Sequence, residues 1–203
     1  MNLLQLRDDF LLKRYRSKDK KVLIELKLES PSHLFDQRDP SPLRERDLHE
    51  SVVRHIVESL NDFPSNYPVT VALYFTQGLQ ADEKEKCEKA FRNFFAFESR
   101  STNFEMKKKM MLGLKAVFMG LNFLLLYIFA ADYLKDSEVL YLKYAVEVLH
   151  VIGWVSLWPA VYIFLYELSP LRDKRDLLQS IAEAELTLSN SPYQGPYELD
   201  SAI

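Results

Sequence analysis

Two long apolar stretches in the second half of the chain restrict its fold more than any other feature. They run from Met110 to Tyr133 and from Tyr144 to Leu168, and each has an uncharged centre, Ala116–Ala131 and Val151–Tyr166. A helix needs about 20 predominantly apolar residues to cross the hydrocarbon core of a bilayer. The stretches therefore predict a transmembrane helical hairpin over residues 110–168. The alternative is a helical hairpin buried inside a soluble domain.

Basic residues crowd the outer ends of both stretches, whereas the connection between them carries only Lys135 and Lys143. Lys and Arg accumulate in the cytoplasmic segments of membrane proteins. We therefore expect a multi-pass protein with both termini in the cytoplasm. The flanking basic residues are Arg100, Lys107, Lys108, Lys109, Lys115, Arg172, Lys174 and Arg175.

Residues 21–109 predict a small cytoplasmic α/β domain. Lys21–Leu28 alternates between apolar and polar residues, as a half-buried strand does, and Tyr67–Phe75 is a more apolar strand that we expect to be more central. Asp47 and Glu50 have the spacing of a helix capping box. The residues that follow at helical period are Leu48, Val52, Val53, Ile56, Val57 and Leu60. The order strand, helix, strand favours parallel pairing. Because two strands make a poor sheet, we expect an unrecognised strand, a partner subunit or cover from the next helix.

That next helix begins near Ala81 and carries an aromatic face with Phe91, Phe94 and Phe95. No proline or glycine follows before Gly113, which leaves open a single helix that continues into the first apolar stretch. The predicted fold is thus an α+β membrane protein, in which a cytoplasmic β-α-β-α domain precedes the transmembrane hairpin and a short C-terminal helix. The remaining boundaries are a basic N-terminal arm at residues 1–20, a cytoplasmic helix at 169–188 and a disordered tail at 189–203.

The segment Ser32–Asp47 is a charged loop with two prolines, Pro40 and Pro42, around Ser41. Loops on a rigid scaffold often carry binding residues. One interpretation is a binding loop in which acidic groups and a histidine gather a cation. The other is a fixed turn at Asp39–Pro42, with Ser41 as a cap. The candidate binding residues of the loop are Asp36, Asp39, Ser41, Asp47 and His49.

Signatures of catalysis are absent from the sequence. No two histidines have the i, i+4 spacing of a helical zinc site, and Cys87 is the only cysteine, which suits a reducing compartment. The five glycines are too scattered for a phosphate-binding loop, and no GxSxG motif occurs. We predict no enzyme, no metal and no cofactor. The net charge of -3 predicts no attraction to nucleic acid.

Polar residues within the apolar stretches are functional candidates because they are costly in hydrocarbon. Glu147 and His150 are one helical turn apart and are either a proton-responsive pair or an interfacial, structural one. Asn122 and Ser156 fall at similar depth in an antiparallel hairpin, which predicts a hydrogen bond between them. Ala116 and Gly120 would permit close helix packing, and Pro159 would bend the second helix.

Several short motifs are spread along the chain. They are Leu34-Phe35, Asp39-Pro40-Ser41-Pro42, Arg46-Asp47-Leu48, Arg92–Phe97, Gly153-Trp154-Val155, Trp158 and Phe164–Glu167. Together they resemble an uncharacterised family of small bacterial two-span membrane proteins with a cytoplasmic α/β domain. The resemblance implies a bacterial inner (plasma) membrane and no established activity. In that family an Arg-Pro pair and an acidic residue follow the second tryptophan. Here Pro159, Ala160 and Tyr162 occupy those positions, so a role tied to that charge does not carry over.

Three functions remain open from the sequence. The first is a non-enzymatic, membrane-anchored interaction or scaffold protein whose contacts are the charged loop and the aromatic face, including Phe97. The second is a subunit of an oligomeric channel or transporter. The third is a membrane-surface enzyme that uses Asp39 and His49. The expected partners are membrane lipid and a protein partner or further copies of the chain.

Overall fold

The alternating pattern at the start of the domain forms the predicted strand, β2 (Lys21–Leu28). The computed structural model of the protein describes residues 17–18, 21–42, 45–61, 63, 68–136 and 139–190. Val22, Ile24 and Leu28 are buried, and Leu26 is partly buried against them. The period of two therefore sets one face of the strand against the core, as predicted.

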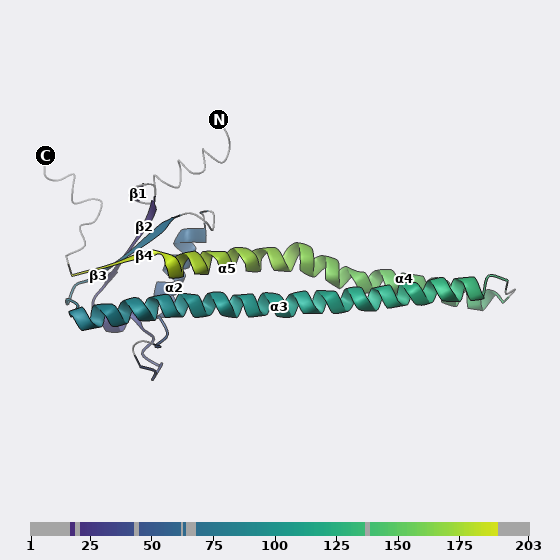
Figure 1. Ribbon diagram of the computed structural model, residues 1–203, viewed down its shortest axis with the longest axis horizontal. Helices are drawn as coiled ribbons and strands as arrows, with labels where there is room; N and C mark the ends of the chain where they lie inside the picture. The colour runs from purple at the N-terminus through teal and green to yellow at the C-terminus, as the bar shows by residue number, and fades with distance from the viewer. Residues whose placement is uncertain are drawn as a thin grey trace, which may run out of the picture. The chain divides into compact units, whose positions relative to one another are not determined.

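Strand β3 (Val69–Phe75) lies in the middle of a small sheet of order β1-β2-β3-β4 (Figure 1). It pairs in parallel with β2 on one side and with β4 (Glu185–Ser189) on the other. The two-residue strand β1 (Ser17–Lys18) pairs antiparallel with β2. The parallel pairing and the central place predicted for the second strand are confirmed.

Strand β4 corrects the predicted cytoplasmic helix at residues 169–188. Helix α5 (Leu168–Glu183) ends before Ala184, and the next five residues form a strand that buries Leu188. Strand β4 is the unrecognised strand that we expected because two strands alone make a poor sheet. Strand β1 lies in the predicted N-terminal arm, whose residues 1–16 and 19–20 are outside the described residues, as are residues 191–203 of the predicted tail.

The connection from β2 to β3 contains a short 3₁₀ turn, η1 (Pro31–Leu34), and helix α2 (Glu50–Asn61). His49, and not Asp47, precedes the first turn of α2. Its carbonyl oxygen accepts the N–H groups of Val52 and Val53, and its Nδ1 accepts the N–H of Ser51 at 3.3 Å. The predicted helix is confirmed, but its cap lies two residues later than the sequence predicted.

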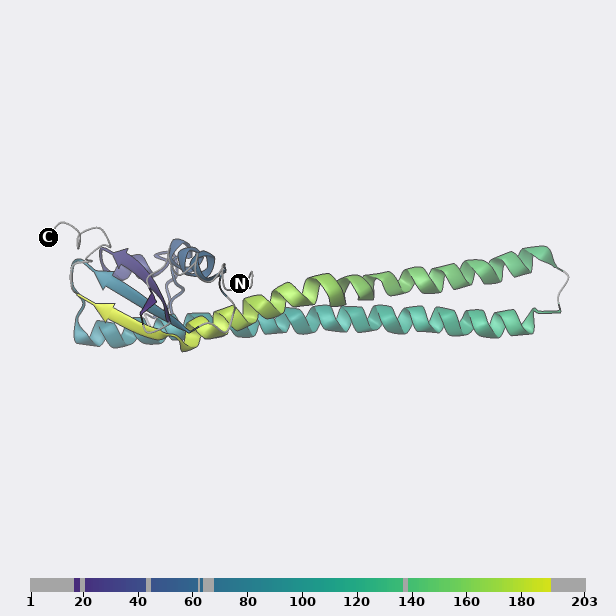
Figure 2. The same ribbon diagram turned by 90° about the horizontal axis from the view of Figure 1, so that it is seen from above.

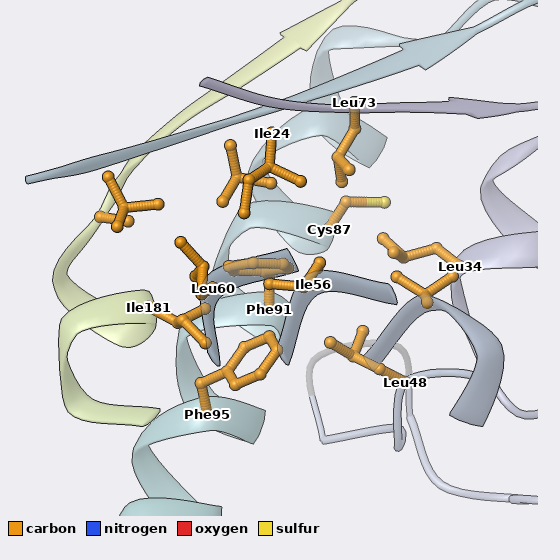
Figure 3. Close-up of a cluster of buried hydrophobic side chains, with 14 of the residues drawn as sticks. Ile24, Leu34, Leu48, Ile56, Leu60, Leu73, Cys87, Phe91, Phe95 and Ile181 are labelled. Carbon is orange, nitrogen blue, oxygen red and sulfur yellow. The ribbon is translucent and has the colours of Figure 1, made fainter. Parts of the chain in front are cut away.

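Helix α3 (Ala81–Tyr133) is one helix of 53 residues. Its first part packs Cys87, Phe91 and Phe95 into the core beneath the sheet, where Figure 3 shows them with Ile24, Leu73 and Ile181. The rings of Phe91 and Phe95 lie 4.8 Å apart. The core thus draws on the sheet, α2, α3 and α5. The described residues up to Arg100 and from Lys174 form this sheet unit, and Ser101–Asp173 forms a separate hairpin unit.

In the hairpin unit, the later part of α3 runs beside α4 (Leu140–Tyr162), which continues through a π-helical segment, η2 (Ile163–Glu167), into α5 (Figure 2). Buried positions recur at seven-residue intervals, as in a coiled-coil seam. They are Gly113 and Gly120 on α3 and Val146, Gly153 and Ala160 on α4. A Cβ atom on Gly120 would lie 2.5 Å from Leu157 Cδ2 and 3.1 Å from the Gly153 carbonyl oxygen. The close helix approach predicted at Gly120 is confirmed.

The outer surfaces of this hairpin are apolar and uncovered. Both long helices contain a segment long and apolar enough to cross a membrane, and only 11% and 17% of those two segments are buried within the chain. Core helices of soluble proteins are instead mostly buried. The exposed side chains include Phe118, Leu125 and Phe129 of α3 and Val151, Trp154 and Trp158 of α4.

Candidate functional site

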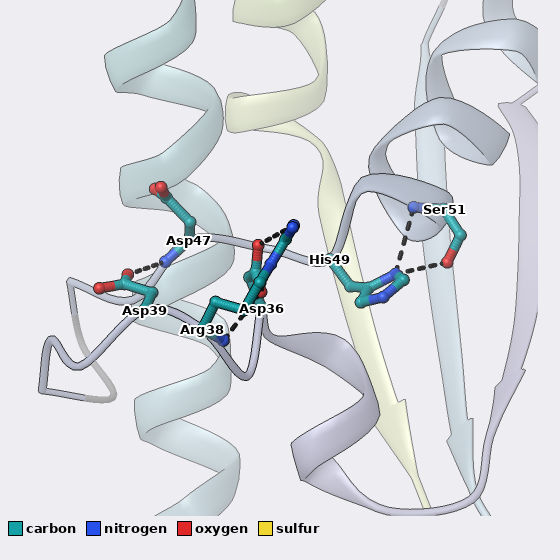
Figure 4. A network of polar contacts seen from close by, with 6 residues as sticks. All are labelled: Asp36, Arg38, Asp39, Asp47, His49 and Ser51. Carbon is teal, nitrogen blue, oxygen red and sulfur yellow. Dashed lines mark hydrogen bonds and ion pairs between the residues drawn. The ribbon is translucent and has the colours of Figure 1, made fainter.

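The charged loop between β2 and α2 holds itself in shape through its own acidic residues. Asp36 Oδ1 accepts the backbone N–H and the Nε–H of Arg38 at 2.9 and 3.1 Å, and Arg38 Nη2 donates to Asp36 Oδ2 at 2.8 Å (Figure 4). The hydrogen bonds from the side chain and backbone of Arg38 lower the pKa of Asp36 from 3.8 to about 2. Asp36 is therefore a structural carboxylate, ionised at neutral pH.

Asp39 joins the two ends of the same loop. Its Oδ1 accepts the Ser41 N–H at 2.9 Å, and its Oδ2 accepts the Asp47 N–H at 2.8 Å. Hydrogen bonds from Ser41 and Asp47 lower the pKa of Asp39. The Glu45 N–H donates to the Pro42 carbonyl oxygen at 2.8 Å. The fixed-turn interpretation fits these bonds, except that Asp39 and not Ser41 supplies the capping oxygen.

The cation interpretation finds no support in this geometry. The carboxylates of Asp36 and Asp39 bind N–H groups of the loop, and His49 Nδ1 lies 2.7 Å from the Ser51 hydroxyl at the start of α2. Among the described residues, no group of three His, Cys, Asp or Glu side chains is placed to hold a metal ion. Within the predicted binding set, the side chains of Asp36, Asp39 and His49 make hydrogen bonds that hold the loop and the start of α2 in shape.

An open hollow of about 390 Å³ lies where the loop meets α3. Phe94 and Phe97 supply its apolar surface, and Phe97 is 66% exposed. The loop adds two carboxylates and one arginine around these rings, and α3 adds Arg100. The lining residues are Glu45, Arg46, Asp47, Ala90, Asn93, Phe94, Ala96, Phe97 and Arg100. The structure thus joins the two candidate contact regions, the loop and the aromatic face, at one place.

The aromatic face divides into buried and accessible residues. Phe91 and Phe95 are 1% and 0% exposed, so both belong to the core and cannot contact a partner. Phe94 is partly buried and packs edge-on against Phe95, with ring centroids 5.4 Å apart. Sequence reasoning missed Arg46, Asn93 and Arg100 as members of this site. These three residues are recognised only from the folded structure, in which the loop lies beside α3.

A second, more polar hollow of about 600 Å³ lies at the carboxyl end of β2. His33, Arg38 and His49 line it, together with Ser32 and Ser51. His33 Nδ1 lies 2.9 Å from the Ser30 hydroxyl, so both histidines contact a nearby serine within their own turn. These local pairs orient the rings. The serine hydroxyls belong to turn and helix-start residues, and in the part of the chain that the structure describes no hydrogen bond joins either histidine ring to a third, orienting side chain.

The predicted hydrogen bond between Asn122 and Ser156 is wrong. Asn122 Nδ2 donates to the Phe118 carbonyl oxygen at 2.7 Å, and the Ser156 hydroxyl donates to the Ile152 carbonyl oxygen at 2.7 Å. Each side chain therefore bonds to its own helix, four residues back. Asn122 is exposed on the outer surface of α3.

His150 forms an aromatic cluster across the hairpin. Its ring stacks on Tyr127 of α3 with centroids 4.5 Å apart, and its Nε2 accepts the indole N–H of Trp154 at 3.0 Å. Its Nδ1 lies 3.8 Å from Glu147 Oε2. The predicted pair of Glu147 and His150 is thus brought together. An ion pair that the sequence did not reveal joins Lys109 Nζ to Glu167 Oε2 at 3.0 Å, at the end of the π-helical segment.

Comparison of the chain with models of known protein families, with curated proteins and with solved structures gives no match.

Proposed function

We propose that the protein is a non-enzymatic, membrane-anchored interaction protein of a bacterial inner membrane, in which the hairpin unit is the anchor and the sheet unit binds a protein partner. The resemblance to small bacterial two-span proteins supports the compartment. The exposed apolar surfaces of α3 and α4 support the anchor, because contiguous apolar surface of this size is rare on soluble monomers.

The topology of the sheet supports termini on the same side of the membrane. Strand β4 follows both apolar helices in the chain, yet it pairs with β3, which precedes them. Both strands belong to one folded unit, so the chain must cross the bilayer an even number of times between them. The basic residues outside the hairpin favour the cytoplasm as the compartment of that unit.

The main support for an interaction function is the hollow beside Phe97. The Phe97 ring is two-thirds exposed, lies next to the partly buried Phe94 ring and has charges of both signs around it. This arrangement resembles the apolar centre and polar rim of a protein interface. It suits a partner that inserts an apolar side chain flanked by charged groups. The carboxylates of Asp36 and Asp39 support the hollow indirectly, since they fix the loop that forms one wall.

Native mass spectrometry of the full chain, extracted gently from its own membrane, tests this function. We expect the wild-type protein to carry a partner that Phe97→Ser removes. Phe104→Ser is the matched control, because Phe104 lies on the same helix with 68% exposure and does not line the hollow. Wild-type protein without a partner, or a complex that survives Phe97→Ser, would contradict the proposal.

Cysteine labelling tests the topology separately. Gln77 and Lys135 are both exposed, one after β3 and one in the connection of the hairpin. With an impermeant maleimide we expect Lys135→Cys to be labelled in intact cells and Gln77→Cys only after lysis. The opposite pattern would invert the orientation, and labelling of both in intact cells would argue against the hairpin anchor.

The two other functions stay predictions with less support. A channel or transporter subunit was suggested by Asn122, Glu147 and His150, but Asn122 faces away from the hairpin seam and His150 is held by Tyr127 and Trp154. An enzyme was suggested by Asp39 and His49, which the loop uses as hydrogen-bond acceptors.

A further inference from the structure

Asn122 lies on the side of α3 that faces away from the rest of the hairpin. At 3.6 residues per turn, it is rotated by roughly 160° from Gly120, which marks the seam with α4. The large side chains that share its face are Phe118, Leu125 and Phe129, and they are 71%, 53% and 71% exposed. Within the described residues of the hairpin, this face packs against no other element.

The carboxamide of Asn122 has most of its hydrogen-bonding capacity unused. A carboxamide offers two N–H donors and an oxygen with two lone pairs. One N–H donates to the Phe118 carbonyl oxygen, and among the described residues no further bond satisfies the second N–H or the oxygen. In hydrocarbon no water can satisfy them, and an unsatisfied polar group there is costly. This cost in free energy disfavours contact of the Asn122 face of α3 with lipid alone.

A second copy of the chain can supply the complementary groups. All copies cross the membrane in the same direction, so the α3 helices of two neighbouring copies are parallel and Asn122 lies at the same depth in both. A two-fold axis along the membrane normal then places Asn122 opposite itself. The free N–H of each carboxamide meets the free oxygen of the other, and the aromatic and leucine side chains on either side pack around the pair. A single Asn in an apolar helix seam is a known determinant of register and partner number.

We propose that the outer face of α3 centred on Asn122 is a homodimer interface, in which the two Asn122 carboxamides form reciprocal hydrogen bonds within the bilayer. The inference rests on the proposed membrane anchor, because the carboxamide lacks partners only where water is excluded. It adds to that function a defined partner and a fixed parallel arrangement of two sheet-bearing chains.

Disulfide cross-linking in native membranes tests the interface. Phe129→Cys lies about 20° from the direction of Asn122 around the helix, and its neighbour Ile128→Cys lies about 120° away. Both positions are exposed, and the native Cys87 is buried and can remain in place. We expect a mild oxidant to link Phe129→Cys into dimers and to leave Ile128→Cys monomeric. Equal linking at both positions, or at Ile128→Cys alone, would overturn the proposed face.

The carboxamide itself is tested by Asn122→Leu, compared with Ser156→Ala, a polar deletion whose side chain also bonds its own helix. From the strength of interhelical hydrogen bonds we expect Asn122→Leu to raise the dimer dissociation constant roughly tenfold in lipid nanodiscs, and Ser156→Ala to leave it unchanged. A wild-type monomer surrounded by lipid, a complex with a different membrane protein at this face, or an unchanged constant in Asn122→Leu would overturn the proposal.

Membrane attachment is measured independently of dimerisation. Resistance of the wild-type protein to alkaline carbonate extraction reports the anchor and does not depend on Asn122. Protein that is released by carbonate contradicts the anchor, and the dimer with it. Protein that stays in the membrane but is monomeric contradicts the dimer alone.

Discussion

At the scale of single residues, the carboxylates of Asp36 and Asp39 determine how the loop responds to acid. Both have a pKa below the ordinary aspartate value because N–H groups of the loop bind their ionised forms. A carboxyl group with a lowered pKa in the folded state stabilises that state above its unfolded pKa. This contribution is lost as the pH falls through the folded pKa.

The first prediction concerns the pH dependence of Asp36→Asn. The contribution of Asp36 is fully present above about pH 4 and disappears as the pH falls from 3.8 towards about 2. We expect the variant to have a lower melting temperature than wild type at pH 6, and the two to converge near pH 2. Thermal unfolding followed by circular dichroism between pH 2 and pH 6 measures this. A constant difference across that range would contradict the role of ionised Asp36.

The second prediction concerns Cys87, which is 2% exposed. Burial, with a smaller effect of Glu83, raises the pKa of its thiol from 9.0 to about 11. The thiolate fraction at pH 7 is therefore about a hundredfold smaller than for an ordinary thiol, and the thiolate is the reactive form. We expect maleimide to label Cys87 at least a hundredfold more slowly in the native protein than in denaturant. Equal rates would show that this part of the core is open.

At the scale of elements, β4 distinguishes the structure from the predicted helix at residues 169–188. In the strand, Leu188 points into the core and Thr187 to the opposite, exposed face. We expect Leu188→Ala to lower the free energy of unfolding by about 2 to 3 kcal/mol, as a large-to-small core substitution does. Thr187→Ala should change it by less than about 0.5 kcal/mol. Chemical denaturation in detergent compares the two, and similar effects would argue against the alternation of a strand.

The seam of the hairpin gives a fourth prediction. Because a Cβ atom on Gly120 would meet Leu157 and the backbone of Gly153, Gly120→Val forces the helices apart. We expect a loss of about 1 to 3 kcal/mol in stability, the usual range for overpacking. Ala145→Val, at an exposed position of α4, is the control and should have little effect. Thermal unfolding in detergent measures both variants, and equal melting temperatures would place Gly120 outside the seam.

Local pattern was enough to predict β2, β3, α2 and α3, because each has its own period of two or 3.6 residues. It failed at β4, since Leu177, Ile181 and Leu188 also fit a helical repeat and only pairing with β3 makes the last segment a strand. It placed Asn122 and Ser156 at equal depth but could not set the rotation of each helix about its axis. The hollow beside Phe97 combines residues about 50 positions apart, so no local pattern contains it.

At the scale of the whole molecule, the sheet unit is built from two separate parts of the chain. Truncation after Asp173 removes most of α5 and all of β4, including the buried Leu177, Ile181 and Leu188. We expect the truncated chain still to resist carbonate extraction, because the apolar hairpin is intact, but to lose the cooperative unfolding of the sheet unit. Limited proteolysis of membrane vesicles measures this. A sheet unit as resistant as wild type would show that β4 is dispensable.

The late position of β4 has a consequence for how the protein is made. A ribosome synthesises β3 and then a further 109 residues, from Thr76 to Ala184, before the strand that pairs with its open edge emerges. At about 5 to 20 residues per second this takes roughly 5 to 20 seconds. For that time one edge of β3 is unpaired, and in the proposed topology this is also when the hairpin enters the bilayer. In the proposed topology, the sheet is therefore completed only after the hairpin has entered the bilayer, and a chain that does not return through the membrane cannot pair β4 with β3.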